Sequence, residues 1–209
     1  MGTKLIARPH YMEWLQRWQG KRVIKVVTGL RRSGKSCVFE LFRDVLRSQG
    51  VPDSNIHDIN FESLDEEYPA EARGLYRYLM QRLGPGTNYV FLDEVQHVRD
   101  FERAVDGLAL RDDIDLYITG SNAYLLSGEL ATLLTGRYVE LHLLPFSFAE
   151  FLSARPRDSN PEVEFNRFLT YGGMPFSARL DDERRILDYL GGVFSTIVLE
   201  DVARRYPRM

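Results

Sequence analysis

The chain has 209 residues, 44% of them hydrophobic and 12% aromatic, with a formal net charge of −3 and one cysteine. This length suits one large domain, or a core with a small appendage, and one cysteine excludes an internal disulfide. No secretory signal pattern and no apolar run of the ~18 residues needed for a membrane span are present, so we expect a cytoplasmic protein without membrane contact. The overall charge gives no argument for a nucleic-acid partner.

Hydrophobic periodicity predicts helices and strands that alternate along most of the chain. A helix is expected first, over residues 10–19, and its stripe of Tyr11, Trp14 and Trp18 is interpreted as a core-facing surface, with adenine stacking by Tyr11 or Trp14 as the alternative. Strands are expected at 23–27, 56–61, 89–92, 116–118 and 138–144, and further helices at 37–48, 75–83, 101–110 and 123–126. Such alternation predicts an α/β fold with a mostly parallel sheet covered on both faces.

The pattern is helical only from Pro145 onward, with segments near 147–154, 161–171 and 182–205. We therefore expect two parts. Residues 1–145 form the core, and residues 146–209 form a helical lid or the start of a truncated C-terminal region.

Residues 29–36 match the phosphate-loop pattern GxxxxGK[ST] at every fixed position, between a predicted strand and a predicted helix. The two glycines allow the backbone N–H groups to curl around a phosphate, and the helix directs its positive dipole end at the same anion. Lys35 can reach the β- and γ-phosphates, and the Ser36 hydroxyl can bind Mg²⁺. Cys37, one residue into the helix, is interpreted as a small buried apolar side chain. The predicted nucleotide-binding residues are Gly29, Leu30, Arg31, Arg32, Ser33, Gly34, Lys35, Ser36 and Cys37.

Two acids follow the third predicted strand, in the sequence Phe91-Leu92-Asp93-Glu94. Asp93 is predicted to hold Mg²⁺ together with Ser36, because this ion prefers carboxylate oxygen and retained water. Glu94 is predicted to polarise the attacking water as a general base. The alternative is a solvated strand end.

Polar residues at the ends of other strands are further candidates. Ser121 or Asn122 follows the fourth strand and could sense the γ-phosphate or act as a helix cap. Arg137 directly precedes the fifth strand and is either a catalytic arginine, acting in its own or a neighbouring subunit, or a solvated strand end. Asn60 could hold Glu94 inactive until a ligand arrives.

Together, these motifs with Thr119-Gly120-Ser121-Asn122, Leu134-Thr135-Gly136-Arg137 and Tyr171-Gly172-Gly173-Met174-Pro175 resemble the AAA-type ATPases of the AAA_14 group, in a branch related to archaeal and STAND-like ATPases and commonly paired with a DUF4143 domain. The resemblance runs from about residue 8 to the end of the chain. It implies a five-stranded P-loop sheet of order 5-1-4-3-2, a helical lid, and ATP with Mg²⁺ as ligands. It also implies that Gly173 and Pro175 approach the nucleotide.

The leading functional prediction is an Mg²⁺-dependent ATPase that couples hydrolysis to conformational change. A nucleotide-gated switch with slow turnover that engages protein or DNA is an alternative, and a small-molecule P-loop kinase is another. A GTPase is disfavoured because no Asn-Lys-x-Asp motif is present. The sequence is compatible with a homo-oligomer and does not specify the oligomeric state.

Overall fold

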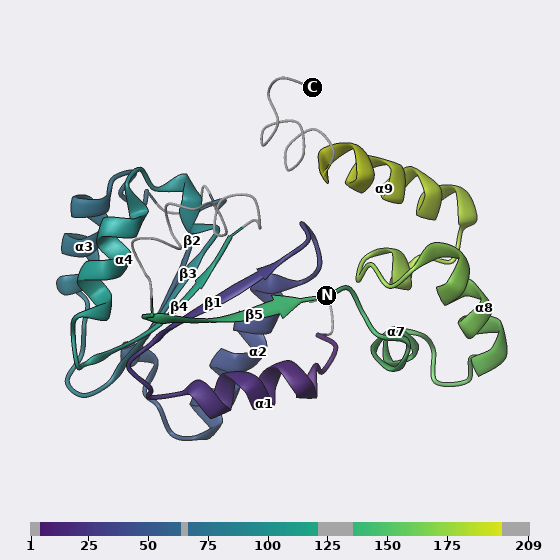
Figure 1. Ribbon diagram of the computed structural model, residues 1–209. Helices are drawn as coiled ribbons and strands as arrows, with labels where there is room; N and C mark the ends of the chain where they lie inside the picture. The colour runs from purple at the N-terminus through teal and green to yellow at the C-terminus, as the bar shows by residue number, and fades with distance from the viewer. Residues whose placement is uncertain (1–4, 64–66, 121–135, 198–209) are drawn as a thin grey trace.

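The computed structural model describes residues 5–63, 67–120 and 136–197. Five parallel strands form one sheet in the order β2-β3-β4-β1-β5, which confirms the expected order 5-1-4-3-2 (Figure 1). Their bounds are β1 Ile24–Gly29, β2 Ile56–Asn60, β3 Asn88–Asp93, β4 Ile114–Thr119 and β5 Tyr138–Leu143. All carboxyl ends of the strands therefore lie at one edge of the sheet.

Helices cover both faces of the sheet, as the continuous apolar strands predict. On one face, Val90 and Leu92 of β3 pack with α3 (Ala72–Met80) and α4 (Phe101–Ala109). On the other face, Tyr89 and Phe91 pack with α1 (Pro9–Trp18) and α2 (Lys35–Ser48). Alternate residues of one strand thus enter different cores.

The aromatic residues of α1 belong mainly to the second core. Tyr11 is buried against it, and Trp14 packs at its margin. Neither ring lines the cavity at the phosphate loop, so the structure favours packing over adenine stacking.

Helix α3 ends earlier than the leucine spacing predicts, at Met80 rather than beside Gly84. The chain tightens there, because the Arg82 N–H bonds to the Leu79 carbonyl at 2.8 Å. The buried side chain of Asn88 then holds the following turn, accepting from the Gly84 N–H at 2.8 Å and donating to the Gly84 carbonyl at 2.9 Å. Hydrogen bonds from the first residue of the following strand thus replace the last helical turn.

The residues after β5 form three helices beside the sheet, seen at the right of Figure 1. We call residues 146–197 the lid, and its helices are α7 Phe148–Ala154, α8 Pro161–Tyr171 and α9 Glu183–Thr196. Phe146 and Phe151 form a small separate core with Ala178 and with Ile6 from the N-terminal segment. The predicted helical stretch 123–126 and residues 198–205 of the last predicted helix lie outside the described residues.

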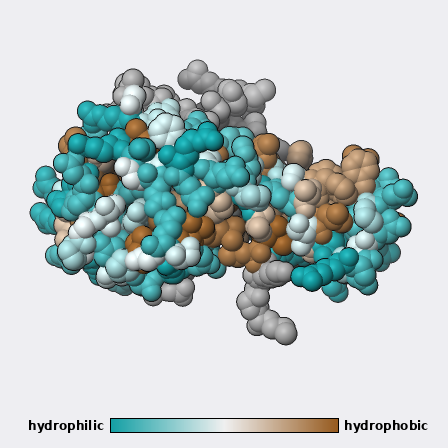
Figure 2. Space-filling view, turned by 90° about the horizontal axis from the view of Figure 1, so that it is seen from below, coloured by the Kyte–Doolittle hydropathy of each residue, from teal (hydrophilic) through white to brown (hydrophobic). Residues whose placement is uncertain are grey.

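Hydrophobic side chains reach the surface mainly on the lid. In the view of Figure 2 they gather over the middle of the molecule and toward the lid. Exposed examples on α8 and α9 are Val163, Phe165, Leu169, Leu187 and Phe194. Within the described ranges, no helix combines the length and apolar character that crossing a membrane requires.

Candidate nucleotide site

The phosphate loop joins β1 to α2 at the carboxyl edge of the sheet. Gly29 has no room for a side chain, because a Cβ there would lie 2.4 Å from the Leu143 carbonyl oxygen of the adjacent strand β5. Gly34 adopts φ +99°, a conformation that side-chain-bearing residues rarely adopt. Both fixed glycines of the motif are therefore required by geometry.

The loop presents several groups suited to an anion. The first backbone N–H groups of α2, Lys35 to Cys37, have no acceptor within the helix, and no side chain caps this end of it. The buried Ser33 hydroxyl has no hydrogen-bond partner among the described residues. A triphosphate fits this set of donors, which combines a helix N-terminus, an unpartnered hydroxyl and the Lys35 ammonium.

Asp93 ends β3 and is almost completely buried, at 3% exposure. Burial raises the pKa of this carboxyl, and hydrogen bonds from Ser36 and Thr119 act in the opposite direction. The phosphate-loop serine and the strand-end aspartate are thus in contact, as a shared Mg²⁺ site requires. These two oxygen donors suit Mg²⁺, which takes few protein ligands and keeps several waters.

Glu94 lies one residue beyond and is held from two sides. Its Oε1 is 3.3 Å from the Lys35 ammonium, and its Oε2 accepts a hydrogen bond of 2.6 Å from Gln96. Its backbone has φ +54°, which is uncommon for a residue other than glycine, and its N–H donates to Thr119 Oγ1 at 3.0 Å. The carboxylate therefore pairs with the lysine of the phosphate loop.

A cavity of about 570 Å³ opens between this loop and the lid. From the core it is lined by Arg31, Arg32, Gly34, Lys35, Ser36, Cys37, Glu62 and Glu94, and from the lid by Pro175, Phe176, Tyr189 and Thr196. The rings of Phe176 and Tyr189 pack with their centroids 4.8 Å apart. Pro175 lines this cavity beside Gly34, on which a Cβ would lie 4.0 Å from the proline ring, whereas Gly173 is not among the lining residues. The approach of Gly173 and Pro175 to a nucleotide stays a prediction.

Of the remaining loop residues, Arg31 and Arg32 line the cavity and Leu30 does not. Leu30 is exposed, and Arg31 donates to Glu62 at 2.9 Å. Arg32, with φ +64°, lies beside Tyr189, where its hydrogen bond and charge oppose the rise in the Tyr189 pKa that burial causes.

The prediction that Cys37 is buried was wrong, because its side chain is exposed and lines the cavity. The buried face of α2 is formed by Val38, Phe39, Phe42 and Leu46. Cys37 precedes this face and points toward the lid side.

Arg137 lies at the opposite edge of the sheet from the phosphate loop. In the register of β1 and β5, Leu143 pairs with Gly29, and Arg137 is six positions earlier along β5. At ~3.3 Å per residue, this corresponds to about 20 Å of strand. Its guanidinium instead pairs with Asp106 of α4 at 2.5 Å. A role at its own phosphate loop is thus incompatible with this geometry. A structural role through the pair with Asp106 and a catalytic role in a second subunit both stay predictions.

The other strand-end candidates have different outcomes. Ser121 and Asn122 lie outside the described residues. The Asn60 side chain accepts from the Glu62 N–H at 2.9 Å, whereas Gln96 and Lys35 hold Glu94. The prediction that Asn60 restrains Glu94 was therefore wrong, because Gln96 and Lys35 make these contacts instead.

Two site residues were missed by the sequence reasoning. Thr119 ends β4, between the strands of the phosphate loop and of Asp93, and donates to the Asp93 carboxylate. It begins the segment Thr119-Gly120-Ser121-Asn122 that contributes to the resemblance, and the strand order alone would have selected it as the last residue of β4. Gln96 follows the two acids, but no pattern marks it before the turn at Val95–His97 is known.

Comparison with known proteins agrees with this architecture. The family model for the AAA domain, AAA_14, matches residues 21–152. An uncharacterised protein of Haemophilus influenzae is 39% identical over 98% of this chain and 52% of its own length. An uncharacterised protein of Methanocaldococcus jannaschii is 32% identical over 85% of this chain and 42% of its own length. The chain thus spans about half the length of these curated relatives.

Solved structures share the fold at low sequence identity. A Walker-type ATPase of Pyrococcus abyssi superimposes with a TM-score of 0.66 at 17% identity, over 97% of this chain and 77% of that chain. The Aeropyrum pernix ORC1 protein, solved in complex with DNA, superimposes with a TM-score of 0.52 at 17% identity, over 98% of this chain and 62% of that chain. Since the family model covers more than half of the sequence, the chain belongs to the AAA_14 family of AAA domains.

Proposed function

We propose that this chain binds ATP with Mg²⁺ and hydrolyses it, and that hydrolysis is coupled to movement of the lid. The observation that carries the proposal is the convergence of Lys35, Ser36, Asp93 and Glu94 at one edge of the sheet, where Lys35 pairs with Glu94 and Ser36 bonds to Asp93. A phosphate-binding loop, a pair of Mg²⁺ ligands and a candidate base are the parts that phosphoryl transfer to water needs.

Each side chain has a separate role in this proposal. The α2 N-terminus and Lys35 bind the phosphates, and Ser36 and Asp93 hold Mg²⁺. When bound, the metal neutralises charge that develops on the phosphate oxygens. Glu94 accepts a proton from the attacking water, and Thr119 orients both acids through its contacts with Asp93 and with the Glu94 N–H.

The contacts of Glu94 also support a second candidate, a nucleotide-gated switch with slow turnover. The carboxylate is engaged by Lys35 and Gln96, so it is free to act only after both contacts change. A protein or DNA partner that moves the lid would then set the rate. Both candidates share the same nucleotide site and differ in basal turnover.

Phosphate release by the isolated chain separates these candidates. Turnover with ATP and Mg²⁺ that is abolished by EDTA supports the ATPase. Tight ATP binding with turnover that rises only on adding DNA or a protein fraction supports the switch. No ATP binding at millimolar concentration, in protein shown to be folded, contradicts both.

A further inference from the structure

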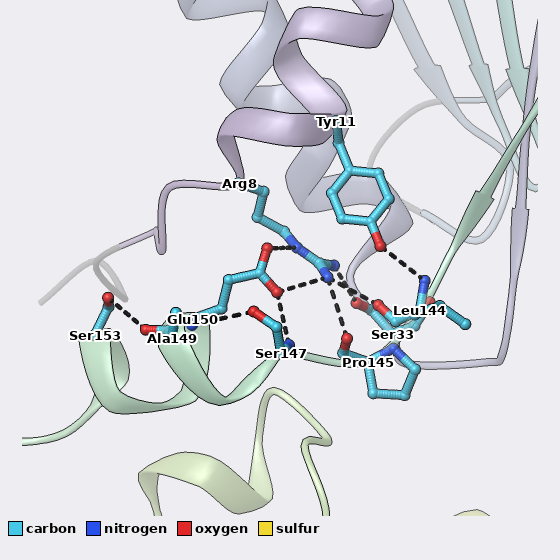
Figure 3. A network of polar contacts seen from close by, with 9 residues as sticks. All are labelled: Arg8, Tyr11, Ser33, Leu144, Pro145, Ser147, Ala149, Glu150 and Ser153. Atoms are coloured by element: carbon cyan, nitrogen blue, oxygen red, sulfur yellow. Dashed lines mark hydrogen bonds and ion pairs between the residues drawn. The ribbon is translucent and has the colours of Figure 1, made fainter. Parts of the chain in front are cut away.

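Arg8 lies immediately before α1 and is buried, with only 2% of its surface exposed. Its guanidinium lies 4.4 Å from the ring centre of Tyr11 (Figure 3). It also lies 5.3 Å from the ring centre of Phe146. The two rings come from opposite sides of the junction between core and lid. The aromatic contacts fix the plane of the guanidinium, which then presents its N–H groups in set directions.

These N–H groups bind three different parts of the protein. One donates to the Ser33 carbonyl of the phosphate loop at 3.3 Å. Nη2 donates to the connection from β5 to the lid, at the carbonyls of Leu144 (2.9 Å) and Pro145 (3.3 Å), which share its hydrogens with Glu150. Nε and Nη2 also donate to the two carboxylate oxygens of Glu150 on α7, at 3.0 and 3.1 Å. One rigid group therefore touches the loop, the connection and the lid.

Glu150 is itself fixed to the lid. Its carboxylate accepts from the Ser147 N–H at 2.8 Å and completes the capping box of α7. Burial alone would raise the pKa of Glu150, but the hydrogen bonds from Arg8 and Ser147 outweigh it and lower the pKa. Because Glu150 is fixed in this way, Arg8 is linked through it to the first turn of α7.

The connection bound by Arg8 also packs against the segment that lines the cavity from the lid side. The Phe146 N–H donates to the Gly173 carbonyl at 2.7 Å, and a Cβ on Gly173 would lie 2.1 Å from the Phe146 carbonyl oxygen. This close fit leads directly into Pro175 and Phe176, which line the cavity. Arg8 itself does not line it, so it acts on the site through other residues.

We propose that Arg8 is a positioning residue that couples occupancy of the phosphate loop to the orientation of the lid. This inference rests on the nucleotide site proposed above. Ser33 belongs to the loop that must close around the phosphates, so a shift of its carbonyl moves the shared guanidinium. The guanidinium is rigid, so it cannot keep all of its hydrogen bonds if the Ser33 carbonyl moves alone. The connection and α7 must therefore move with it.

Amide hydrogen exchange of residues 148–154 and 161–171 tests the coupling, with and without a non-hydrolysable ATP analogue and Mg²⁺. In the wild type, the analogue should slow exchange in the lid. Arg8→Met keeps the apolar stem but removes every hydrogen bond, so the nucleotide-induced protection should fall about tenfold, within the range typical of coupling between sites. Analogue binding should persist, because Arg8 is outside the cavity.

Arg155→Met is the matched control. The Arg155 side chain is only 7% exposed and also binds a carboxylate, Glu164, together with the Ala178 carbonyl. Among the described residues, its hydrogen-bond partners all lie between 164 and 181. This variant should speed lid exchange in both states and retain the nucleotide-induced difference. If Arg8→Met misfolds, Glu150→Gln replaces it, since glutamine also completes a capping box but removes the charged pair.

Four outcomes decide the matter. Loss of the nucleotide-induced difference in Arg8→Met or Glu150→Gln but not in Arg155→Met supports the inference. Full retention in the Arg8 and Glu150 variants, or equal loss in Arg155→Met, overturns it. A wild type that binds the analogue without any lid protection overturns the coupling alone. A wild type that binds no analogue refutes the proposed function, and the coupling with it.

Discussion

Glu94→Gln tests two roles of Glu94, as the partner of Lys35 and as the candidate general base. In the structure, the Lys35 ammonium is 3.3 Å from Glu94 Oε1, and both side chains are nearly buried. Lys35 must leave this partner to reach a phosphate, so the pair competes with ATP. Glutamine keeps the shape and can still contact Gln96, but it removes the charge that holds Lys35.

The expected magnitude follows from this competition. A hydrogen bond to a charged group contributes about 1.5–3 kcal/mol, so its loss in the free protein should tighten ATP binding roughly tenfold or more. Hydrolysis should fall by roughly 10²–10⁴, the usual contribution of a positioned base. The variant should therefore bind more tightly and turn over more slowly.

Calorimetric titration with ATP and Mg²⁺, together with single-turnover hydrolysis, measures the two effects separately. Glu62→Gln is the control, because Glu62 lines the same cavity but pairs with Arg31 rather than Lys35. Equal gains in affinity for both variants would show a general charge effect. Wild-type hydrolysis in Glu94→Gln would remove Glu94 from the chemistry.

Three further predictions concern the rest of the molecule. Lys25→Met leaves the buried Asp115 carboxylate without its cation and should lower the free energy of unfolding in urea by about 3–5 kcal/mol, whereas a change below about 1 kcal/mol would contradict this. Because the pKa of Glu150 is lowered in the folded protein, this carboxylate stabilises the fold above its ordinary pKa, and the stabilisation is lost as the pH falls through the folded pKa. Glu150→Gln should therefore flatten the pH dependence of the free energy of unfolding below about pH 4.5. An unchanged pH profile would contradict this prediction. Arg137→Ala should leave ATP affinity intact and lower turnover by up to about 10³–10⁵, with rescue on mixing with Lys35→Ala protein. Wild-type turnover in Arg137→Ala would make it a structural arginine paired to α4 only.

The sequence predicted those parts of the fold and site that local rules determine. Strand periodicity and the glycine spacing at Gly29 and Gly34 are local constraints, and they correctly implied a parallel sheet with the loop at its carboxyl edge. The resemblance supplied the strand order, which sequence spacing alone does not specify. The contact of Ser36 with Asp93 then follows, because parallel strands bring their ends together.

The remaining features depend on tertiary contacts that no local pattern records. Cys37 was misjudged because the helix face toward the core begins one residue later, at Val38. The early end of α3 depends on Asn88, which belongs to the following strand. Arg8 precedes a helix like many solvated arginines, and its role emerges only when Ser33 and Glu150 are brought to it from 25 and 142 residues away.

The central claim is that Lys35 belongs to a site that binds ATP. Calorimetric titration of ATP with Mg²⁺ into the wild type and into Lys35→Ala tests it most directly, with unfolding curves to show that the variant is folded. Losing the ammonium from a desolvated charge pair should cost about 2–5 kcal/mol, which corresponds to roughly 30-fold to several thousand-fold weaker binding. Equal affinity in the two folded proteins, or no binding by the wild type, would contradict the account.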